Sequence, residues 1–277
     1  MPLLVSGDIL ERVKRIEVAW NRHGIDRFGV DQVDLARFLS MLAWFYRSYF
    51  TVTVNGITHV PTRGRGMIIC NHTGGVALDA AMILVSLLLE MDPPRLGQGM
   101  AEKFINRVPF ASQFTARAGQ LTGLPEHAIQ LLEDDRLLMV FPEGARGTAK
   151  LYGDRHTLVR FGTGFMRLAL QTKTPIIPTA FLGGGEAIPT VVNLERLGKI
   201  LGVPYIPITP YILPVPRPVP LEIYYSEPMV FEGTGSEEDS VIFGYVEQVR
   251  ARIAKMIDTG HRIRRGRDSD SEKAQVS

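Results

Sequence analysis

Cysteine is almost absent from this chain: Cys70 is the only one among 277 residues. A single thiol cannot form an internal disulfide, and it excludes a metal site built from a cluster of cysteines. It fits a reducing compartment but says little about location by itself. Hydrophobic residues make up 45% of the chain, so we expect a fold held together by a sizeable buried core.

A strong excess of charge is also missing. The chain carries 31 basic and 29 acidic residues, for a net charge of +2. Nucleic-acid-binding domains show a strong basic excess instead, so we expect no nucleic-acid partner. Charged residues make up 22%, a composition that excludes a globally disordered or collagen-like chain. The mean hydropathy of +0.06 is high for a freely soluble enzyme and indicates apolar surface.

No helical run reaches the length of about 18–20 apolar residues that a membrane-spanning helix needs. Segments 38–46 and 80–89 are too short, and the uncharged segment 200–216 holds five prolines, which prevent a continuous helix. The first ten residues lack the basic and apolar regions of a signal peptide. We therefore expect a peripheral membrane protein on the cytoplasmic side. Segment 200–216 is predicted to be a buried connection, an apolar loop in the membrane interface, or the wall of a lipid tunnel.

Helix-like and strand-like segments alternate after residue 50, which predicts an α/β sheet with covered faces. The expected extended segments are 51–58 (strand, turn, strand), 67–70, 95–100, 137–141, 175–181 and 221–225. The expected helices are 79–90, 103–118, 128–134, 163–173 and 237–257.

Two helices are predicted before this alternating region. Residues 8–23 show helical spacing of apolar side chains, and Asp31 can cap a second helix that runs to about residue 49. Aromatic side chains at the end of that helix are typical of an interfacial helix, with an ordinary packing helix as the alternative. These side chains are Trp44, Tyr46, Tyr49 and Phe50. The predicted organisation is N-terminal interfacial helices over 1–50, a domain over 51–259, and a disordered tail over 260–277.

Several catalytic signatures are missing from the chain. There is no Gly-x-Ser-x-Gly elbow, which disfavours a standard α/β-hydrolase, and no Walker P-loop or His-Glu-x-x-His motif. The glycine pairs at 97–99 and 162–164 lack the third glycine of a dinucleotide fingerprint.

Two polar segments do carry candidate chemistry, and each follows a strand-like run. Asn71 and His72 follow the first, with Asp79 seven positions after the histidine. A histidine at the carboxyl end of a strand sits where α/β sheets place ligands, and a carboxylate could orient it to take a proton from a hydroxyl. The second segment is Phe141-Pro-Glu-Gly-Ala-Arg146, which offers the Glu143 carboxylate and a guanidinium to a polar or anionic group.

The order of these segments resembles the glycerolipid acyltransferase superfamily of the PlsC-like, or lysophosphatidic-acid acyltransferase, type. Residues 71–79 match an Asn-His-x4-Asp block, and 141–146 match a Phe-Pro-Glu-Gly-x-Arg block in full. Lys103, Phe104, Pro109 and Gly119 match a further block loosely, and 175–178 match a Pro-Ile-Ile-Pro block. The resemblance implies a mixed, largely parallel central sheet flanked by helices (glycerol-3-phosphate acyltransferase-like), with 51–259 as the acyltransferase domain behind an N-terminal helical pair.

The chain departs from the family pattern in two places. Six residues separate His72 from Asp79 instead of four, and in a continuous helix residues seven apart lie about 10.5 Å apart along the axis. Asp79 can reach His72 only if the backbone folds back at Gly74-Gly75. The family often has an arginine for the acceptor phosphate after the position of Gly119, but here Arg117 precedes that glycine. This favours a less charged acceptor, as in the diacylglycerol-acyltransferase-like branches.

The resemblance implies a function for these residues. A fatty acyl group would pass from acyl-CoA or acyl-carrier protein to the hydroxyl of a (lyso)glycerolipid or related lipid alcohol at a membrane lipid surface. His72 would be the general base, oriented by Asp79. Substrate-binding roles would fall to Asn71, Lys103, Arg117, Glu143, Gly144 and Arg146. No metal and no cofactor beyond the acyl thioester is implied. The alternatives are a lipid esterase or thioesterase and a non-catalytic lipid-binding protein.

Overall fold

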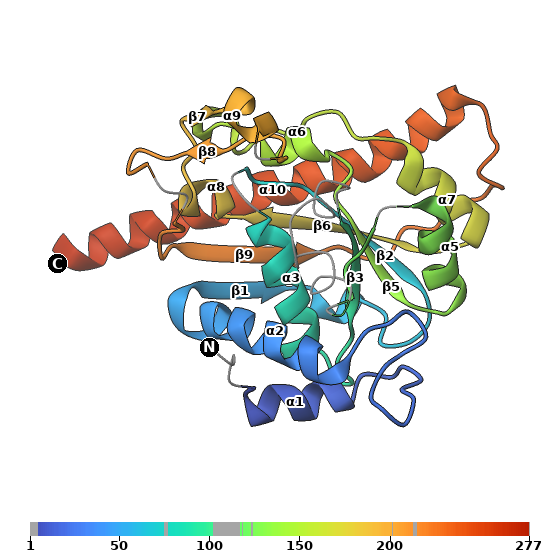
Figure 1. Ribbon diagram of the computed structural model, residues 1–277. Helices are drawn as coiled ribbons and strands as arrows, with labels where there is room; N and C mark the ends of the chain where they lie inside the picture. Colours follow the sequence, from blue (N-terminus) through green and yellow to red (C-terminus); the bar gives the residue numbers. More distant parts are fainter. Residues whose placement is uncertain are drawn as a thin grey trace.

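The computed structural model describes residues 5–74, 77–101, 117, 119–122, 124–200, 202–212 and 215–276. A seven-stranded sheet with the order β1-β9-β6-β2-β5-β3-β4 forms its centre (Figure 1). Its strands are β1 (Thr51–Asn55), β2 (Gly66–Cys70), β3 (Gly97–Ala101), β4 (Leu121–Thr122), β5 (Leu137–Val140), β6 (Ile176–Leu182) and β9 (Pro220–Tyr225). A separate two-stranded hairpin pairs β7 (Val192–Asn193) with β8 (Pro207–Ile208).

Most strand pairs in the sheet are parallel. β2 lies parallel to both β5 and β6, and β3 lies parallel to β5 and β4. β9 reverses the direction, since it runs antiparallel to β6 and parallel to β1. Parallel neighbours need crossover connections, which the intervening helices supply. The prediction of a mixed, largely parallel sheet flanked by helices is confirmed.

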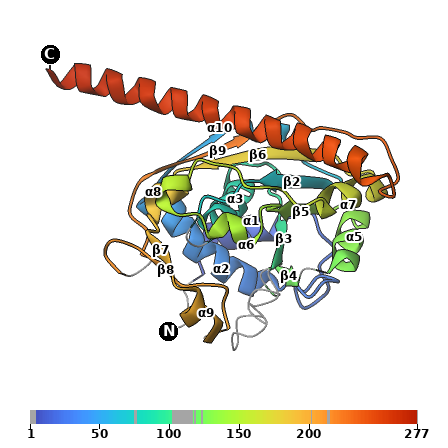
Figure 2. The same cartoon turned by 90° about the horizontal axis from the view of Figure 1, so that it is seen from above.

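Helices cover both faces of the sheet, as Figure 2 shows from above. Side chains alternate along β2: Met67 and Ile69 join the cluster packed by the helices over 125–133, 164–172 and 239–276, whereas Ile68 and Cys70 join the cluster packed by the helices over 7–14, 32–44 and 78–89. This alternation is the two-residue period of a strand buried on both faces. The longer helices are α1 (Gly7–Lys14), α2 (Gln32–Trp44), α3 (Leu78–Leu89), α5 (Pro125–Glu133), α7 (Gly164–Thr172) and α10 (Asp239–Val276).

Short helices complete the described chain: η1 (Phe45–Tyr49), η2 (Ile57–His59), α6 (Ala145–Thr148), η4 (Tyr152–Asp154), α8 (Gly184–Ala187) and α9 (Glu195–Ile200). None of the helices within the described residues has both the length and the apolarity to cross a membrane. The helix predicted over 103–118 falls almost entirely outside the described residues.

The N-terminal helices differ in part from their prediction. Asp31 caps α2 by accepting hydrogen bonds from the amides of Val33 and Asp34, as expected. The first helix ends at Lys14 rather than near residue 23. The Asn21 side chain accepts hydrogen bonds from two later amides, and this turn replaces the last part of the predicted helix.

The aromatic cluster at the end of α2 mostly faces the protein interior. Tyr46 and Phe50 are buried in the core cluster that contains α1 and α3, whereas Trp44 is 55% exposed. The Tyr46 hydroxyl donates to Glu90, and this hydrogen bond satisfies the polar group of a largely buried side chain. Tyr46 and Phe50 therefore act as packing residues of the core, and an interfacial role for this segment, with Trp44 exposed, stays a prediction.

Two further predictions are corrected by the structure. The segment predicted as strand, turn, strand over 51–58 is the single strand β1 followed by η2, because β1 pairs with β9 instead of folding back on itself. The tail predicted to be disordered over 260–277 continues α10 to Val276. Contacts with the sheet account for its first turn: Gly260 lies against Leu182 and Tyr224, and Arg264 donates to the carbonyl of Pro220.

Candidate active site

The two polar segments that follow strands meet at the carboxyl ends of β2 and β5. β2 and β5 are parallel neighbours with Ile69 in register with Val140, so the residues after both strands emerge side by side. His72 follows β2 and Glu143 follows β5, and the amide nitrogen of His72 donates to Glu143 Oε1 over 3.0 Å. Strand topology therefore brings together two motifs that are 71 residues apart in the sequence.

The imidazole of His72 contacts a buried carboxylate. Its Nδ1 lies 3.0 Å from Oδ2 of Asp79, which is 1% exposed in the first turn of α3. The chain turns back at Gly74, whose φ is +93°, and a Cβ there would lie 2.8 Å from the carbonyl oxygen of Lys150. Only glycine adopts this conformation in so little space. The backbone reversal that the six-residue spacing requires is present at Gly74; Gly75 lies outside the described residues.

The ring of His72 is packed against a neighbouring aromatic side chain but is not completely buried. It stacks on Phe141 with ring centroids 4.3 Å apart and an interplanar angle of 9°. Its side chain is 10% exposed, and within the described residues no hydrogen bond occupies Nε2. With Nδ1 facing Asp79, Nε2 is the ring nitrogen that can exchange a proton with a substrate.

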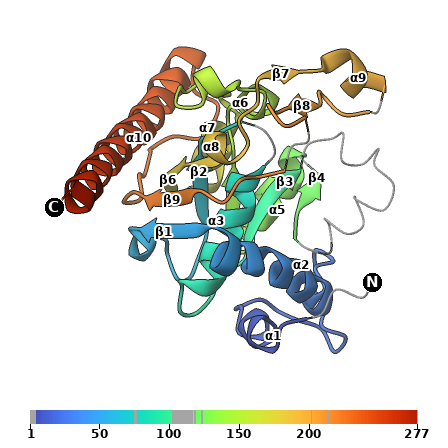
Figure 3. The same cartoon turned by 90° about the vertical axis from the view of Figure 1, so that its left-hand side faces the viewer.

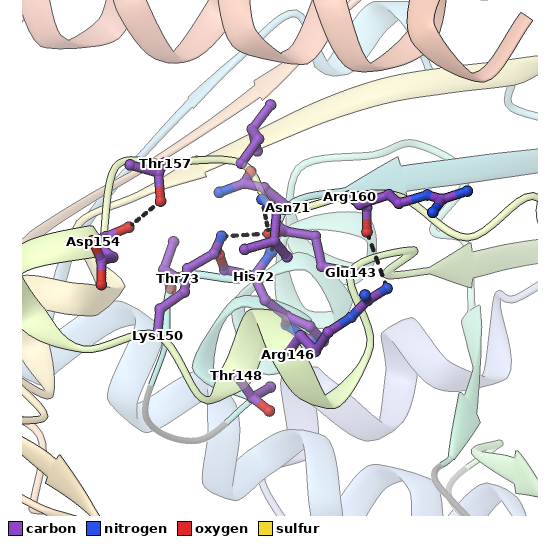
Figure 4. Close-up of polar contacts among 12 residues, drawn as sticks. Asn71, His72, Thr73, Glu143, Arg146, Thr148, Lys150, Asp154, Thr157 and Arg160 are labelled. Carbon is purple, nitrogen blue, oxygen red and sulfur yellow. Dashed lines mark hydrogen bonds and ion pairs between the residues drawn. The ribbon is translucent and has the colours of Figure 1, made fainter. Parts of the chain in front are cut away.

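Glu143 and Lys150 both contact the main chain of His72 (Figure 4). Glu143 Oε2 accepts from the amide of Val159 over 2.9 Å and lies 2.6 Å from the Lys150 ammonium. Lys150 Nζ also donates to the carbonyl oxygen of His72 over 2.6 Å. The two side chains are 0% and 2% exposed. Both oxygens of Glu143 are thus occupied inside the protein, so the structure does not present it to a substrate.

Two glycines shape the turn between these groups. Gly144 has φ 57° and ψ −150°, a combination that side-chain-bearing residues avoid. At Gly147 a Cβ would lie 2.8 Å from the Cβ of His72 and 2.6 Å from the Cβ of Glu143. Gly144 thus shapes the backbone rather than contacting a ligand by a side chain. Gly147 and Lys150 were missed from the sequence; the glycine after Arg146 was the one available signal, and nothing marked the lysine.

The other predicted site residues are dispersed. Asn71 exchanges two hydrogen bonds with the main chain of Phe181, which tie β2 to β6. Arg117 pairs with Asp34 on α2. Arg146 is exposed and extends toward the carbonyl oxygen of Arg160, 3.4 Å away, as Figure 4 shows. Lys103 lies outside the described residues. Arg146 is therefore the predicted ligand-binding side chain that stays accessible beside His72.

Charge in the site comes from two buried carboxylates and one ammonium. Burial raises the pKa of the Cys70 thiol well above its usual range, and the charges of Asp79 and Glu143 raise it further. Cys70 is therefore a neutral core residue rather than a nucleophile. Among the described residues there is no group of three or more His, Cys, Asp and Glu side chains arranged to hold a metal ion.

The sequence of this chain is similar to those of several known proteins. A family model described as Acyltransferase matches residues 51–182. An uncharacterized protein of Mycobacterium tuberculosis is 31% identical over 247 residues, which cover 85% of this chain and 69% of the relative. A 1-acyl-sn-glycerol-3-phosphate acyltransferase of Cocos nucifera is 24% identical, over 83% of this chain and 65% of the relative.

A solved structure shares the fold. The crystal structure of PlsC, the 1-acyl-sn-glycerophosphate acyltransferase from Thermotoga maritima, superposes with a TM-score of 0.56 at 15% identity. The match covers 91% of this chain and 87% of that one, so the similarity extends over nearly the whole fold.

Proposed function

Because this chain belongs to the acyltransferase family, we propose that it transfers a fatty acyl group from a thioester to the hydroxyl of a lipid alcohol. The donor would be acyl-CoA or acyl-carrier protein, and the acceptor a (lyso)glycerolipid. The observation that carries the proposal is the contact between His72 Nδ1 and Asp79 at the carboxyl end of β2, in a histidine whose side chain keeps 10% of its surface exposed.

In the proposed chemistry one proton moves from the acceptor hydroxyl to His72 and then from His72 to the leaving thiolate. His72 Nε2 takes the proton of the acceptor hydroxyl as the oxygen attacks the thioester carbonyl, and a positioned base is worth about 10²–10⁴-fold. The new C–O ester bond forms, the C–S bond breaks, and the leaving thiolate receives the proton from the imidazolium. Asp79 holds the ring in the required tautomer and stabilises its charged form. No acyl-enzyme intermediate is required.

Glu143 and Lys150 support this step through the main chain of His72. The two hydrogen bonds to the His72 amide and carbonyl fix the position of the backbone that carries the ring, and the stacking on Phe141 limits the rotation of the ring. Glu143 is thus proposed as a positioning residue rather than an acceptor ligand. Arg146 is the proposed contact for the polar head of the acceptor, and roles for Lys103 and Arg117 stay predictions.

The acceptor class follows from residues that are missing near Gly119. No basic residue follows it up to Pro125, and Arg117 is engaged with Asp34. We therefore propose an acceptor of low charge over a phosphorylated one. A lipid acceptor places the enzyme at a membrane surface, and its predicted cytoplasmic side stays a prediction.

The test is transfer of radiolabelled acyl groups from acyl-CoA to a panel of monoacyl- and diacylglycerols by the purified chain. His72→Ala should lose at least about 10²-fold in kcat, whereas His23→Ala, at an exposed position, should keep it. Near-normal transfer by His72→Ala would end the assignment of the base. Free fatty acid without ester product would favour the esterase or thioesterase alternative, and lipid binding without turnover would favour the non-catalytic one.

A further inference from the structure

One segment stands off the body of the protein. Residues 188–217, here called the outer hairpin, leave the domain after α8, form β7, α9 and β8, and return to β9 (Figure 3). Its base is fixed: the carbonyl of Thr190 accepts from the amide of Tyr152 over 2.8 Å, and that of Pro216 accepts from the Tyr49 hydroxyl over 2.6 Å. The segment is therefore an anchored element with a projecting end.

The outer hairpin exposes large apolar side chains in unusual concentration. Of the seventeen that are exposed within the described residues, eight lie in this short segment. Their exposed fractions are Ile200 80%, Ile212 71%, Val215 55%, Val191 50%, Val192 45%, Leu197 44%, Tyr211 41% and Leu194 38%. Single exposed apolar residues are normal, but such a concentration marks a surface that another phase or molecule covers.

The body of the protein does not cover these side chains. In α9, Gly198 is the one buried residue, because the helix rests on the backbone of Tyr205, which precedes β8. The remaining described positions of α9 point outward. A helix this exposed gains little from the fold to which it is attached, so its apolar content needs a different explanation.

Charge on the hairpin indicates what covers it. Arg196, Lys199 and Arg217 are exposed, and Glu195 is the single acidic residue between 188 and 217. Apolar side chains interspersed with basic ones match a bilayer that carries anionic headgroups. We propose that the outer hairpin docks on an anionic phospholipid bilayer, with its aliphatic side chains in the interface and its basic residues at the phosphates.

The hairpin is also coupled to the active site. The Asn193 side chain donates to the carbonyl of Ala149 over 2.6 Å, and the next residue, Lys150, donates to the carbonyl of His72. A docked hairpin would therefore place the loop that supports His72 near the membrane. This part of the inference rests on the proposed function, because it assigns the lipid acceptor to the same membrane that the hairpin contacts.

The experiment is co-sedimentation of the full chain with vesicles of phosphatidylcholine and phosphatidylglycerol in equal parts, and with phosphatidylcholine alone. The variant Leu197→Ser with Ile200→Ser should bind mixed vesicles at least about tenfold more weakly, because burial of each aliphatic side chain is lost. The matched control is Val230→Ser with Val241→Ser, whose side chains are 71% and 42% exposed outside the hairpin. The control should bind as the parent does.

The charges are tested separately. Arg196→Gln with Lys199→Gln should weaken binding to the mixed vesicles about tenfold or more and leave binding to phosphatidylcholine unchanged. Equal binding by parent and hairpin variants would overturn the proposal. A result in which Trp44→Ser loses binding while the hairpin variants keep it would overturn the proposal too. A hairpin variant that changes the oligomeric state in light scattering, without changing vesicle binding, would assign the surface to a second copy and also overturn it.

Activity in detergent micelles separates this inference from the proposed function. The hairpin variants should keep acyl transfer to a micelle-dispersed acceptor while losing vesicle binding. If the parent binds vesicles as expected but acylates no acceptor, the proposed function fails and the docking surface stands. If the parent is active and the hairpin variants bind vesicles normally, the docking surface fails and the proposed function stands.

Discussion

Asp79 and Glu143 are two buried carboxylates that hold different parts of the same histidine. Asp79 faces the imidazole ring from the first turn of α3, whereas Glu143 faces the amide of His72 from the loop after β5. Glu143 is neutralised by the Lys150 ammonium at 2.6 Å. Within the part of the chain that the structure describes, Asp79 contacts the ring and the amides of Thr73 and Ala80 and no cationic side chain. The carboxylate without a cationic partner is therefore the one placed to stabilise a charged imidazole.

This difference separates chemistry from positioning. A carboxylate on the ring changes the free energy of the imidazolium, which exists only during the reaction. A carboxylate on the main chain changes where the ring lies and how stable its loop is, before and after the reaction. Substitutions at the two positions should therefore affect different measurements.

The largest effect is expected at Asp79. Asp79→Asn keeps the shape of the side chain but removes the charge that stabilises the imidazolium, so kcat should fall about 10²–10⁴-fold. KM for the thioester should change little. Steady-state kinetics checks this, with Asp258→Asn, at an exposed position on α10, as the control. A loss below about tenfold would mean that the ring does not depend on this carboxylate.

The next effect concerns the ion pair beneath the ring. Lys150→Met leaves the Glu143 carboxylate buried without its cation, and breaking a buried pair in this way costs about 3–5 kcal/mol in the free energy of unfolding. Glu143→Gln combined with Lys150→Met removes both charges, so the double variant should be more stable than Lys150→Met alone. Chemical denaturation measures both.

The control for the ion pair is an exposed one. Lys14→Met breaks the pair with Glu11, whose members are 50% and 70% exposed, and should change the free energy of unfolding by less than about 1 kcal/mol. A positioning role further requires the double variant to regain kcat as well as stability. Recovery of stability without any recovery of kcat would show that Glu143 or Lys150 takes part in the reaction more directly.

A smaller effect is expected at the accessible end of the same loop. Arg146→Gln removes a charged hydrogen-bond donor, a contact worth about 1.5–3 kcal/mol when it is made to a charged group and less for a neutral one. We expect KM for the acceptor to rise about tenfold or less, with kcat nearly unchanged. If Glu143→Gln instead raises KM for the acceptor more than Arg146→Gln does, the internal role of Glu143 is wrong.

The smallest effect concerns Cys70, which lies next to both carboxylates. Its thiol pKa is raised by burial and by their charges, so the folded protein keeps the proton at a pH where the unfolded chain has lost it. The unfolded state then binds fewer protons, and the contribution of this group to stability falls as the pH rises above about 8.5. At pH 8 a thiol reagent should label the unfolded chain quickly and the folded protein slowly. Equal rates would show that the strand end opens readily.

Much of the fold could be predicted from local patterns. The runs of apolar residues that became β2, β5 and β6 are short, uncharged and bounded by turn residues, and this is a local property. The cap at Asp31 is equally local, since it depends on a side chain and the amides two and three positions later. The end of the first helix at Lys14 was predicted wrongly because a competing turn decides it. The single strand β1 was predicted wrongly because its partner strand is distant in the sequence.

Some residues of the site could be predicted and others could not, because contacts between distant segments carry no local signal. His72 and Asp79 stand out because they follow a strand-like run and belong to a block that resembles the family pattern, and their contact depends on one backbone reversal at Gly74. Glu143 was recognised as important, but its direction was not predictable, since a carboxylate in a turn can face solvent or the interior. Its partner Lys150 carries no local signal at all.

The sequence by itself determined the buried strands β2, β5 and β6 and the helices between them, the lack of disulfides, and the identity of the polar residues that follow β2 and β5. Those features depend on neighbours within a few positions, where side-chain period and turn chemistry act. Only the tertiary structure decided which carboxylate contacts the ring and which contacts the backbone. It also placed Lys150 against a carbonyl 78 residues away and left the outer hairpin uncovered. These outcomes depend on strand register and packing, which join segments that the sequence keeps far apart.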